Sequence, residues 1–348
     1  MAKVTKIRPC APSALPLRKG KEKIMKRRLA LAAVSSLLYV ILIPALSFSQ
    51  AAFPSKPIQI LIGYAPGGST DVLIRALAQE SKKYLGQEVV IVNKPGSAGS
   101  VAAAQVAAAS PDGYTLGASP SSTFTVNPFL QDLQVDLINE TTSLLSVAKF
   151  NVAVFVKNDS PFKTLKELIE YARQNPGKVT YGNPGVGTRP HLVMAMAAAQ
   201  EQIKMNLIPF PGDGPTVTAL LGGHLTAAGC SAGGWVPHVQ AGSLRLLAVA
   251  EEERIDEYGN IPTLIELGYP HSLPLVVAVY GPKGLPEPIT KKLVEAFDKA
   301  SKDPVFIDVA TKNSLLAKKN IFREDLKNFL IKEKASTGEI IQKLGLKK

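Results

Sequence analysis

The sequence predicts an α/β protein with two similar halves, each containing a mainly parallel sheet flanked by helices. Two observations lead to this fold class. Short, strand-like apolar runs alternate with helical patterns from residue 58 to residue 118, and the same alternation restarts near residue 150. The chain has 348 residues, of which 46% are hydrophobic, so it is long and apolar enough for about two domains.

The first half begins with a nearly continuous apolar run at 58–62, which is typical of a strand buried on both faces. Pro66-Gly67-Gly68 ends this strand, and a helix follows with Ser69 or Thr70 as its N-cap and Gly86 as its stop. The β-α-β-α-β order implies parallel strands with helices on the faces of the sheet. The predicted elements are strands at 58–62, 88–92 and 114–118 and helices at 69–85 and 101–109.

The second half repeats this alternation. Thr164 and Glu167 form a capping box at the start of one helix, and Pro215 suits the first turn of another. From residue 286 onward the chain is helical and rich in lysine. The predicted elements are strands at 152–156, 179–182, 207–210, 225–230 and 244–250, and helices that begin near 164, 189 and 215.

The basic excess of the chain is confined to its start. The formal net charge is +12. Residues 1–50 contain ten Lys or Arg residues and one acidic residue, a net of +9, and the remaining 30 basic and 27 acidic residues leave +3. A nearly balanced body is a poor binder of a phosphate backbone, so we expect no nucleic-acid partner.

Residues 1–51 are interpreted as a leader for secretion. Lys26-Arg27-Arg28 is followed by an apolar stretch at 29–46 and then by small residues, which is the pattern of a signal peptide. An uncleaved membrane anchor is the alternative, because about 18 apolar residues nearly span a bilayer. Translation begins at Met1 or at Met25, which directly precedes the basic residues.

Cleavage of this leader would set the start of the mature protein and its cysteine content. The small residues at 47–51 place the cut so that the mature chain begins between about Gln50 and Phe53. Cys10 is then lost and Cys230 is alone, so no intrachain disulfide is possible.

A hydrolase motif is present in weak context. Gly229-Cys230-Ser231-Ala232-Gly233 matches the G-x-S-x-G pattern of a nucleophile elbow, which needs a helix directly after the serine. Gly233-Gly234 and Pro237 weaken that helix. A serine hydrolase using Ser231, with His238 or His271 downstream, is therefore the least favoured function.

The sequence gives no support to a metal or nucleotide site. No two of the four histidines are three or four residues apart, and no C-x-x-C occurs. The stretch Gly182 to Gly187 lacks the G-x-G-x-x-G spacing, and no P-loop pattern is present. We therefore expect neither a metal nor a cofactor.

Glycine-rich loops at strand-to-helix junctions are the strongest chemical signal. They lie at 66–71, 185–188 and 212–214. Loops of this kind leave backbone N–H groups free at the positive end of a helix, where a carboxylate or phosphate binds. Ordinary turn chemistry uses the same residues and is the alternative. Because such loops occur in both halves, the two interpretations are about equally supported.

Many stretches match one known family in the same order. They include Pro54-Ser55-Lys56-Pro57-Ile58, Gly63 through Asp71, Asn93-Lys94-Pro95-Gly96, Pro111-Asp112-Gly113-Tyr114, Gly185-Val186-Gly187-Thr188, Ala219 through Gly223, and Ala241 through Val249. Over about residues 53–300, the chain resembles the Bug (tripartite tricarboxylate transporter) family of periplasmic solute-binding proteins.

The resemblance implies a flytrap fold of the periplasmic-binding-protein type, with 52–149 plus 278–348 as one domain and 150–277 as the other. It implies that a periplasmic, monomeric, non-enzymatic protein captures a small organic carboxylate in the cleft. The partners would be the membrane subunits of a tripartite tricarboxylate transporter, or alternatively a two-component sensor kinase. The implied ligand-binding residues are Tyr64, Ala65, Gly67, Gly68, Ser69, Thr70, Asp71, Ser121, Ser122, Gly185, Val186, Gly187, Thr188, His191, Gly212 and Asp213.

Two departures from the family pattern bear on the ligand. Arg189-Pro190 stands where the family has small or polar residues, and Arg189 would either contact a second carboxylate or face solvent. Leu275-Val276-Val277 replaces an aromatic residue near the return crossing. Arg75, one turn into the first helix, is expected to pair within its own domain.

Overall fold

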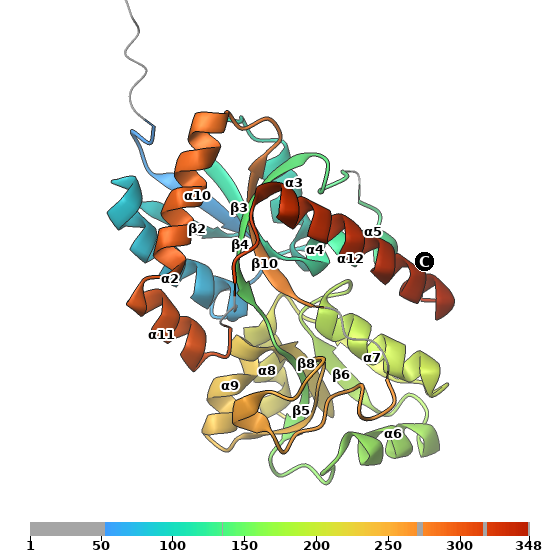
Figure 1. Cartoon of the computed structure of the whole chain (residues 1–348). Coiled ribbons are helices and arrows are strands. Elements are labelled where there is room, and N and C mark those ends of the chain that lie inside the picture. Colours follow the sequence, from blue (N-terminus) through green and yellow to red (C-terminus); the bar gives the residue numbers. More distant parts are fainter. Residues whose placement is uncertain (1–52, 134, 270–273, 316–318, 347–348) are drawn as a thin grey trace, which may run out of the picture. The chain divides into compact units, whose positions relative to one another are not determined.

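The computed structural model describes residues 53–133, 135–269, 274–315 and 319–346. The leader, its cleavage pattern, Cys10 and His271 lie outside the described residues. Residues 53–348 form one compact unit that contains two five-stranded sheets (Figure 1). We call each sheet with the helices packed on it a lobe, the first lobe being the one that contains the start of this unit.

The first lobe is built on a sheet with the strand order β2-β1-β3-β10-β4. Strands β1, β2 and β3 pair in parallel, with Ile60 opposite Ile91 and Leu116, whereas β10 runs antiparallel to both of its neighbours. β1 is buried except at Gln59, as its apolar run predicts. The strands are β1 (Ile58–Ile62), β2 (Val89–Asn93), β3 (Thr115–Pro120), β4 (Thr141–Lys149) and β10 (Val276–Pro282).

Helices from distant parts of the chain cover this sheet. α10 and α11 pack against α2, while α12 packs against β4 and α4, so the C-terminal region lies on the first lobe (Figure 1). α2 stops where Gly86 adopts a left-handed φ of 71°, as predicted. The helices are α2 (Ser69–Leu85), α3 (Ser100–Ala107), α4 (Ser122–Thr125), α5 (Asn127–Leu130), α10 (Glu287–Ser301), α11 (Pro304–Lys312) and α12 (Arg323–Lys343), with a short 3-10 helix η1 (Ser97–Gly99).

The second lobe repeats this plan with the strand order β7-β6-β8-β5-β9. Here β5 is the strand that runs antiparallel to its neighbours. The capping box of Thr164 and Glu167 is formed as predicted. The elements are strands β5 (Val152–Lys157), β6 (Thr180–Asn183), β7 (Asn206–Pro209), β8 (Ala227–Ser231) and β9 (Leu244–Val249), helices α6 (Leu165–Gln174), α7 (Arg189–Gln200), α8 (Asp213–Leu221) and α9 (Ala232–Gln240), and a 3-10 helix η2 (Asp256–Tyr258).

The chain passes between the lobes at two places that lie side by side. The first crossing joins β4 to β5, and the backbone N–H of Phe150 within it donates to the carbonyl of Leu275 in the second crossing, at 2.7 Å. Glu251 fastens the first crossing: one carboxylate oxygen accepts from the N–H of Val152, and the other lies 2.8 Å from Nζ of Lys149. The two crossings therefore form a single hydrogen-bonded junction.

Two local predictions were wrong. The N-cap of α2 is Gly68, not Ser69 or Thr70, because the helix begins one residue earlier than its polar residues suggest. A helix does follow Ser231 directly, despite Gly233-Gly234 and Pro237. Its apolar residues explain why, since Trp235 and Val236 are buried in the core and tertiary packing outweighs weak helix propensity.

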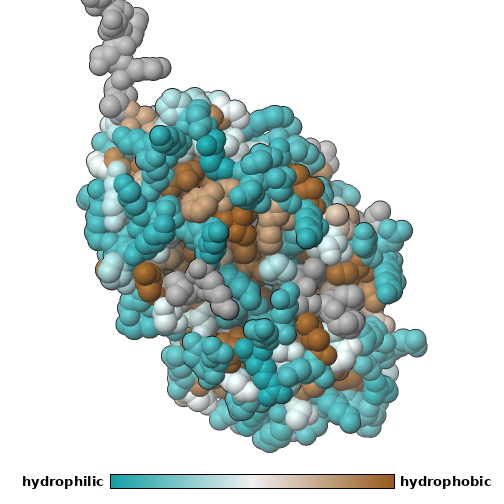
Figure 2. Space-filling model, viewed as in Figure 1, coloured by the Kyte–Doolittle hydropathy of each residue, from teal (hydrophilic) through white to brown (hydrophobic). Residues whose placement is uncertain are grey.

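Figure 2 shows a face that is mostly hydrophilic, with apolar side chains in small separate groups. Among the described residues, none of the helices combines the length and the apolar character needed to cross a membrane.

Candidate ligand-binding site

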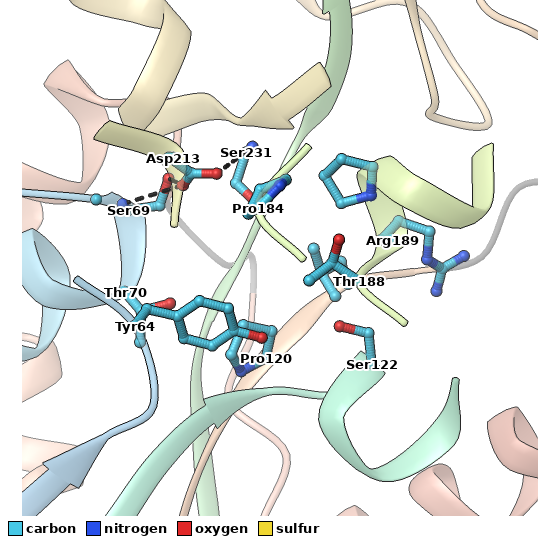
Figure 3. Close-up of a pocket in the computed structure, with 13 residues that line it drawn as sticks. Tyr64, Ser69, Thr70, Pro120, Ser122, Pro184, Thr188, Arg189, Asp213 and Ser231 are labelled. Carbon is cyan, nitrogen blue, oxygen red and sulfur yellow. Dashed lines mark hydrogen bonds between the residues drawn. The ribbon is translucent and has the colours of Figure 1, made fainter. Parts of the chain in front are cut away.

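A narrow pocket of about 20 Å³ lies where the two lobes meet, at the carboxyl ends of the strands. Residues at the starts of α2, α7, α8 and α9 form much of its wall, so several helix N-termini converge on it (Figure 3). The lining residues are Tyr64, Gly68, Ser69, Thr70, Pro120 and Ser122 from the first lobe, Pro184, Thr188, Arg189, Pro190, Asp213 and Ser231 from the second, and Leu275 from the crossing.

Three hydroxyl groups in this wall have no partner among the described residues. The side chains of Thr70, Ser122 and Ser231 are each at most 6% exposed, and no hydrogen bond within the described part of the chain engages their hydroxyls. Figure 3 shows the Ser122 hydroxyl pointing into the middle of the pocket. A hydroxyl can donate one hydrogen bond and accept others, so these three groups are available to a polar ligand.

The loop before α2 is held by a polar cluster behind the pocket. The Asp71 carboxylate accepts from the N–H of Gly67 and from the side chains of Arg75 and Asn93. Burial raises the pKa of Asp71, but these hydrogen bonds outweigh it and hold the pKa below its usual value. Arg75 thus pairs within its own lobe, as expected, and Asp71 shapes the loop.

The loop before α7 touches the first lobe closely. Gly187 has a φ of +91°, and a Cβ atom there would lie 1.7 Å from Oδ1 of Asn127. Thr188 is the N-cap of α7: its hydroxyl donates to the carbonyl of Gly185 at 2.7 Å and accepts from the N–H of His191 at 3.4 Å. The Thr188 hydroxyl is therefore already engaged within its own loop.

Asp213 connects the two lobes through one carboxylate. Its Oδ2 accepts from the backbone N–H and the hydroxyl of Ser69, at 3.2 and 2.6 Å, and its Oδ1 accepts from the N–H of Ser231 at 3.3 Å. Ser69 begins α2 of the first lobe, while Ser231 precedes α9 of the second (Figure 3). Burial raises the pKa of Asp213, and the hydrogen bonds from both serines oppose that rise.

Arg189 is buried, which corrects the expectation that it faces solvent. Its Nη2 lies 2.9 Å from Glu333 of α12 and also donates to the carbonyl of Pro274. Burial lowers the pKa of Arg189 to about 10 and raises the pKa of Glu333, while their mutual attraction opposes both shifts. The positive charge of Arg189 is therefore matched inside the protein.

Comparison with known proteins identifies the family of the chain. A family model described as "Tripartite tricarboxylate transporter family receptor" matches residues 73–346.

The chain belongs to this family.

Relatives and solved structures agree with this assignment and confirm the resemblance to Bug proteins. The receptor is 35% identical over 324 residues to the UPF0065 protein in gbd 5'region of Cupriavidus necator, covering 92% of this chain and 97% of that protein. The solved structure of the periplasmic binding protein BugD is 26% identical, with a TM-score of 0.81, and covers 85% of this chain and 99% of BugD. The structure of MatC from Rhodopseudomonas palustris with bound malate is 24% identical, with a TM-score of 0.78 over 83% of this chain and 100% of MatC, and shares the fold. The predicted two-domain α/β fold is confirmed.

The receptor brings seven of the predicted ligand-binding residues to the pocket: Tyr64, Gly68, Ser69, Thr70, Ser122, Thr188 and Asp213. Gly185 and Val186 instead line an adjacent cavity of about 430 Å³, which shares Tyr64 and Pro184 with the pocket. The predicted residues that line neither are Ala65, Gly67, Asp71, Ser121, Gly187, His191 and Gly212.

Sequence reasoning missed part of the receptor's pocket wall. Pro184, Pro190 and Leu275 carry no chemical signal. Ser231 was considered only as a nucleophile, although its place at the end of a predicted strand marks it as a residue of the ligand edge.

The receptor has the strand and the helix of a nucleophile elbow around Ser231, but among the described residues no histidine is hydrogen-bonded to that serine. The N–H of Ser231 donates to Asp213. His238 lies in the last turn of α9. The described part of the chain also contains no group of three His, Cys, Asp or Glu residues that could hold a metal ion.

Proposed function

We propose that the chain is a periplasmic, monomeric, non-enzymatic receptor that captures a small organic carboxylate between its lobes and delivers it to the membrane subunits of a tripartite tricarboxylate transporter. Its two domains would be 52–149 with 278–348, and 150–277. The observation that carries the proposal is the convergence of the starts of α2, α7 and α9 on one pocket. Helix N-termini stabilise an anion through free N–H groups and the helix dipole.

The environment of the pocket supports an anionic and polar ligand. The unpartnered hydroxyls of Thr70, Ser122 and Ser231 add donors, while Pro120, Pro184, Pro190 and Leu275 limit the contact with water. In this structure the pocket has room for about one water molecule, so a ligand enters only when the lobes separate and then close on it.

The N-terminal sequence supports export. A basic segment, an apolar stretch at 29–46 and small residues precede the folded unit that begins at Phe53. BugD, which shares the fold, is a periplasmic binding protein.

A matched series of four-carbon compounds tests the ligand class. Succinate has two carboxylates, succinamate has one carboxylate and one amide, and succinamide has two amides, while the shape is nearly constant. We expect at least one of the two acids to bind in calorimetry and succinamide not to bind, because only a carboxylate makes charge-assisted hydrogen bonds to the helix ends. Malate, which MatC contains, extends the series.

The closing motion provides a second readout. Small-angle scattering should show compaction when a binding acid is added at saturation, because both lobes must reach the ligand. Mass spectrometry of compounds released from the purified receptor should find an organic acid. Binding of succinamide as tight as that of the acids, or release of a compound without a carboxyl group, contradicts the proposal.

A further inference from the structure

The carboxylate of Asp213 already occupies an anion position in the wall of the pocket. It belongs to α8 of the second lobe, and it accepts from the first N–H of α2 in the other lobe and from the N–H of Ser231 before α9. These are the groups that a bound carboxylate would use at two helix N-termini. Asp213 thus stands where a ligand carboxylate could stand.

The position of Asp213 is fixed by close packing. The residue is 7% exposed. A Cβ atom on Gly234 would lie 2.7 Å from Cβ of Asp213, so this glycine makes the space that Asp213 fills, whereas a Cβ on Gly68 would lie at 3.6 Å, an ordinary contact distance. The short hydrogen bond to the Ser69 hydroxyl, 2.6 Å, is of the charge-assisted kind.

Asp213 keeps one acceptor site for a ligand. An ionised carboxylate offers about four lone-pair sites. Ser69 uses two of these on Oδ2, and Ser231 uses one on Oδ1, while the neighbouring Cys230 thiol donates to the backbone carbonyl of Asp213 at 3.8 Å and not to its carboxylate. Within the part of the chain that the structure describes, no ion pair involves Asp213, and the residue lines the pocket. Its Oδ1 can therefore accept a hydrogen bond from a bound molecule.

The wall of the pocket opposite Asp213 presents hydrogen-bond donors and, among the described residues, no carboxylate. It is formed by the start of α7, where Pro190 has no N–H and the N–H of Arg189 has no described hydrogen-bond partner. The Nε of Arg189 is likewise buried and has no partner among the described residues, while Nη2 binds Glu333. The helix start and a buried donor favour an anion here.

We propose that Asp213 takes, with its own carboxylate, the place of a second ligand carboxylate, so that this receptor selects a ligand with one carboxylate facing α7 and an N–H or O–H donor facing Asp213. This specificity rests on the proposed function. A dicarboxylate would bring a like charge against Asp213, which is costly in a pocket with little water. A ligand amide, hydroxyl or ammonium group would instead complete the hydrogen bonds of Oδ1.

Succinate and succinamate test this inference because they differ only at one end. We expect the wild-type receptor to bind succinamate at least about tenfold more tightly than succinate in calorimetry. In Asp213→Asn and Asp213→Ser, the preference should fall by at least about tenfold or reverse, because the like charge is gone. Asp308→Asn, which removes an exposed carboxylate on α11, is the matched control and should keep the wild-type preference.

The outcomes separate the two proposals. Equal affinity of wild-type receptor for succinate and succinamate, or an unchanged preference in both Asp213 variants, overturns the role of Asp213 and leaves carboxylate binding intact. Absence of binding by both acids to wild type and variants contradicts both proposals. A cooperative thermal unfolding transition shows that each variant is folded. If one of the two Asp213 substitutions prevents folding, the other, which differs in size, still gives the test.

Discussion

The Glu333 carboxylate on α12 lies 2.9 Å from the guanidinium of Arg189 at the start of α7, and the two side chains are 3% and 2% exposed. α12 packs on the first lobe and α7 belongs to the second, so the pair joins the lobes. Nearby, Ile341 of α12 packs with Leu192 and Met196 of α7. The contact is incomplete, because Nε of Arg189 and Oε2 of Glu333 are buried and have no partner within the described part of the chain. A pair of this kind stabilises weakly, yet it is costly to break.

Removal of one partner should therefore destabilise the receptor more than removal of both. We expect Glu333→Leu or Arg189→Met alone to lower the free energy of unfolding by ~3–5 kcal/mol, because a buried charge then loses its ionic partner. The double variant should recover most of this loss. Urea unfolding of the four proteins forms a double-mutant cycle, and additive losses would contradict the expectation.

The receptor should lose stability in acid through His191. Burial lowers the pKa of this side chain to about 4, and its Nδ1 is buried with no partner among the residues that the structure describes. In the unfolded chain, His191 has the ordinary pKa of about 6.5, so it binds a proton more readily than in the folded protein. The contribution of neutral His191 to the free energy of unfolding is therefore fully present above about pH 6.5 and declines as the pH falls toward 4. The decline should reach about 3 kcal/mol.

Denaturant unfolding between pH 7 and pH 4 measures this loss. His191→Asn should show a smaller decline than the wild type over the same range. His224→Asn, at an exposed histidine, is the control for the substitution. A wild-type slope in His191→Asn would show that other groups cause the decline.

Gly187 and Gly67 should respond very differently to a methyl group. Both have left-handed φ values, +91° and +79°, so alanine costs about 1 kcal/mol of backbone strain at either position. At Gly67 nothing lies within 4 Å of the added Cβ, whereas at Gly187 the Cβ would collide with Asn127 of the other lobe. Gly187→Ala should thus prevent full closure, and scattering with a saturating acid should show compaction only in Gly67→Ala. Equal compaction in both variants would contradict this.

The exported protein should begin just before the folded unit. Phe53 is already part of that unit: its ring packs against Tyr114 at 5.1 Å, and its carbonyl accepts from Lys292. N-terminal sequencing of the periplasmic fraction should give a start between about Gln50 and Phe53. A protein that retains residues 29–46 would be an anchored form.

Ser231 should have no hydrolytic activity. A serine nucleophile needs a base within hydrogen-bond reach, and no described hydrogen bond connects Ser231 to a histidine. We expect wild-type receptor and Ser231→Ala to release nitrophenol from nitrophenyl acetate at the same slow rate. A rate that depends on Ser231 would restore the hydrolase hypothesis.

Local patterns predicted the fold because its signals are local. The run at 58–62, the left-handed glycine at 86 and the capping box at Thr164 each act within a few residues, and all appear in the structure. The helix after Ser231 could not be predicted in this way. It forms because Trp235 and Val236 are buried by residues distant in sequence.

The site was predictable at its glycine loops and not at its charges. Glycines at strand-to-helix junctions indicate the ligand edge of the sheet, and of these Gly68 lines the pocket and Gly185 an adjacent cavity, whereas Gly67, Gly187 and Gly212 line neither. Asp213 reaches Ser69, and Arg189 reaches Glu333, each across 144 residues. Such pairings depend on how the two lobes meet, so the sequence near each residue does not predict them. For this reason Arg189 was expected in solvent or at the ligand although it is buried.

The hydrogen bond between Phe150 and Leu275 ties the two interlobe crossings to each other, and Glu251 braces the first of them. Two lobes joined by paired crossings can rotate about that junction, but the crossings resist sliding or twisting of one lobe against the other. We therefore expect the lobes to move mainly by rotation about this junction, a motion described by one opening angle. A membrane partner that recognises the outer edges of both lobes needs to sense only that angle to distinguish a loaded receptor from an empty one.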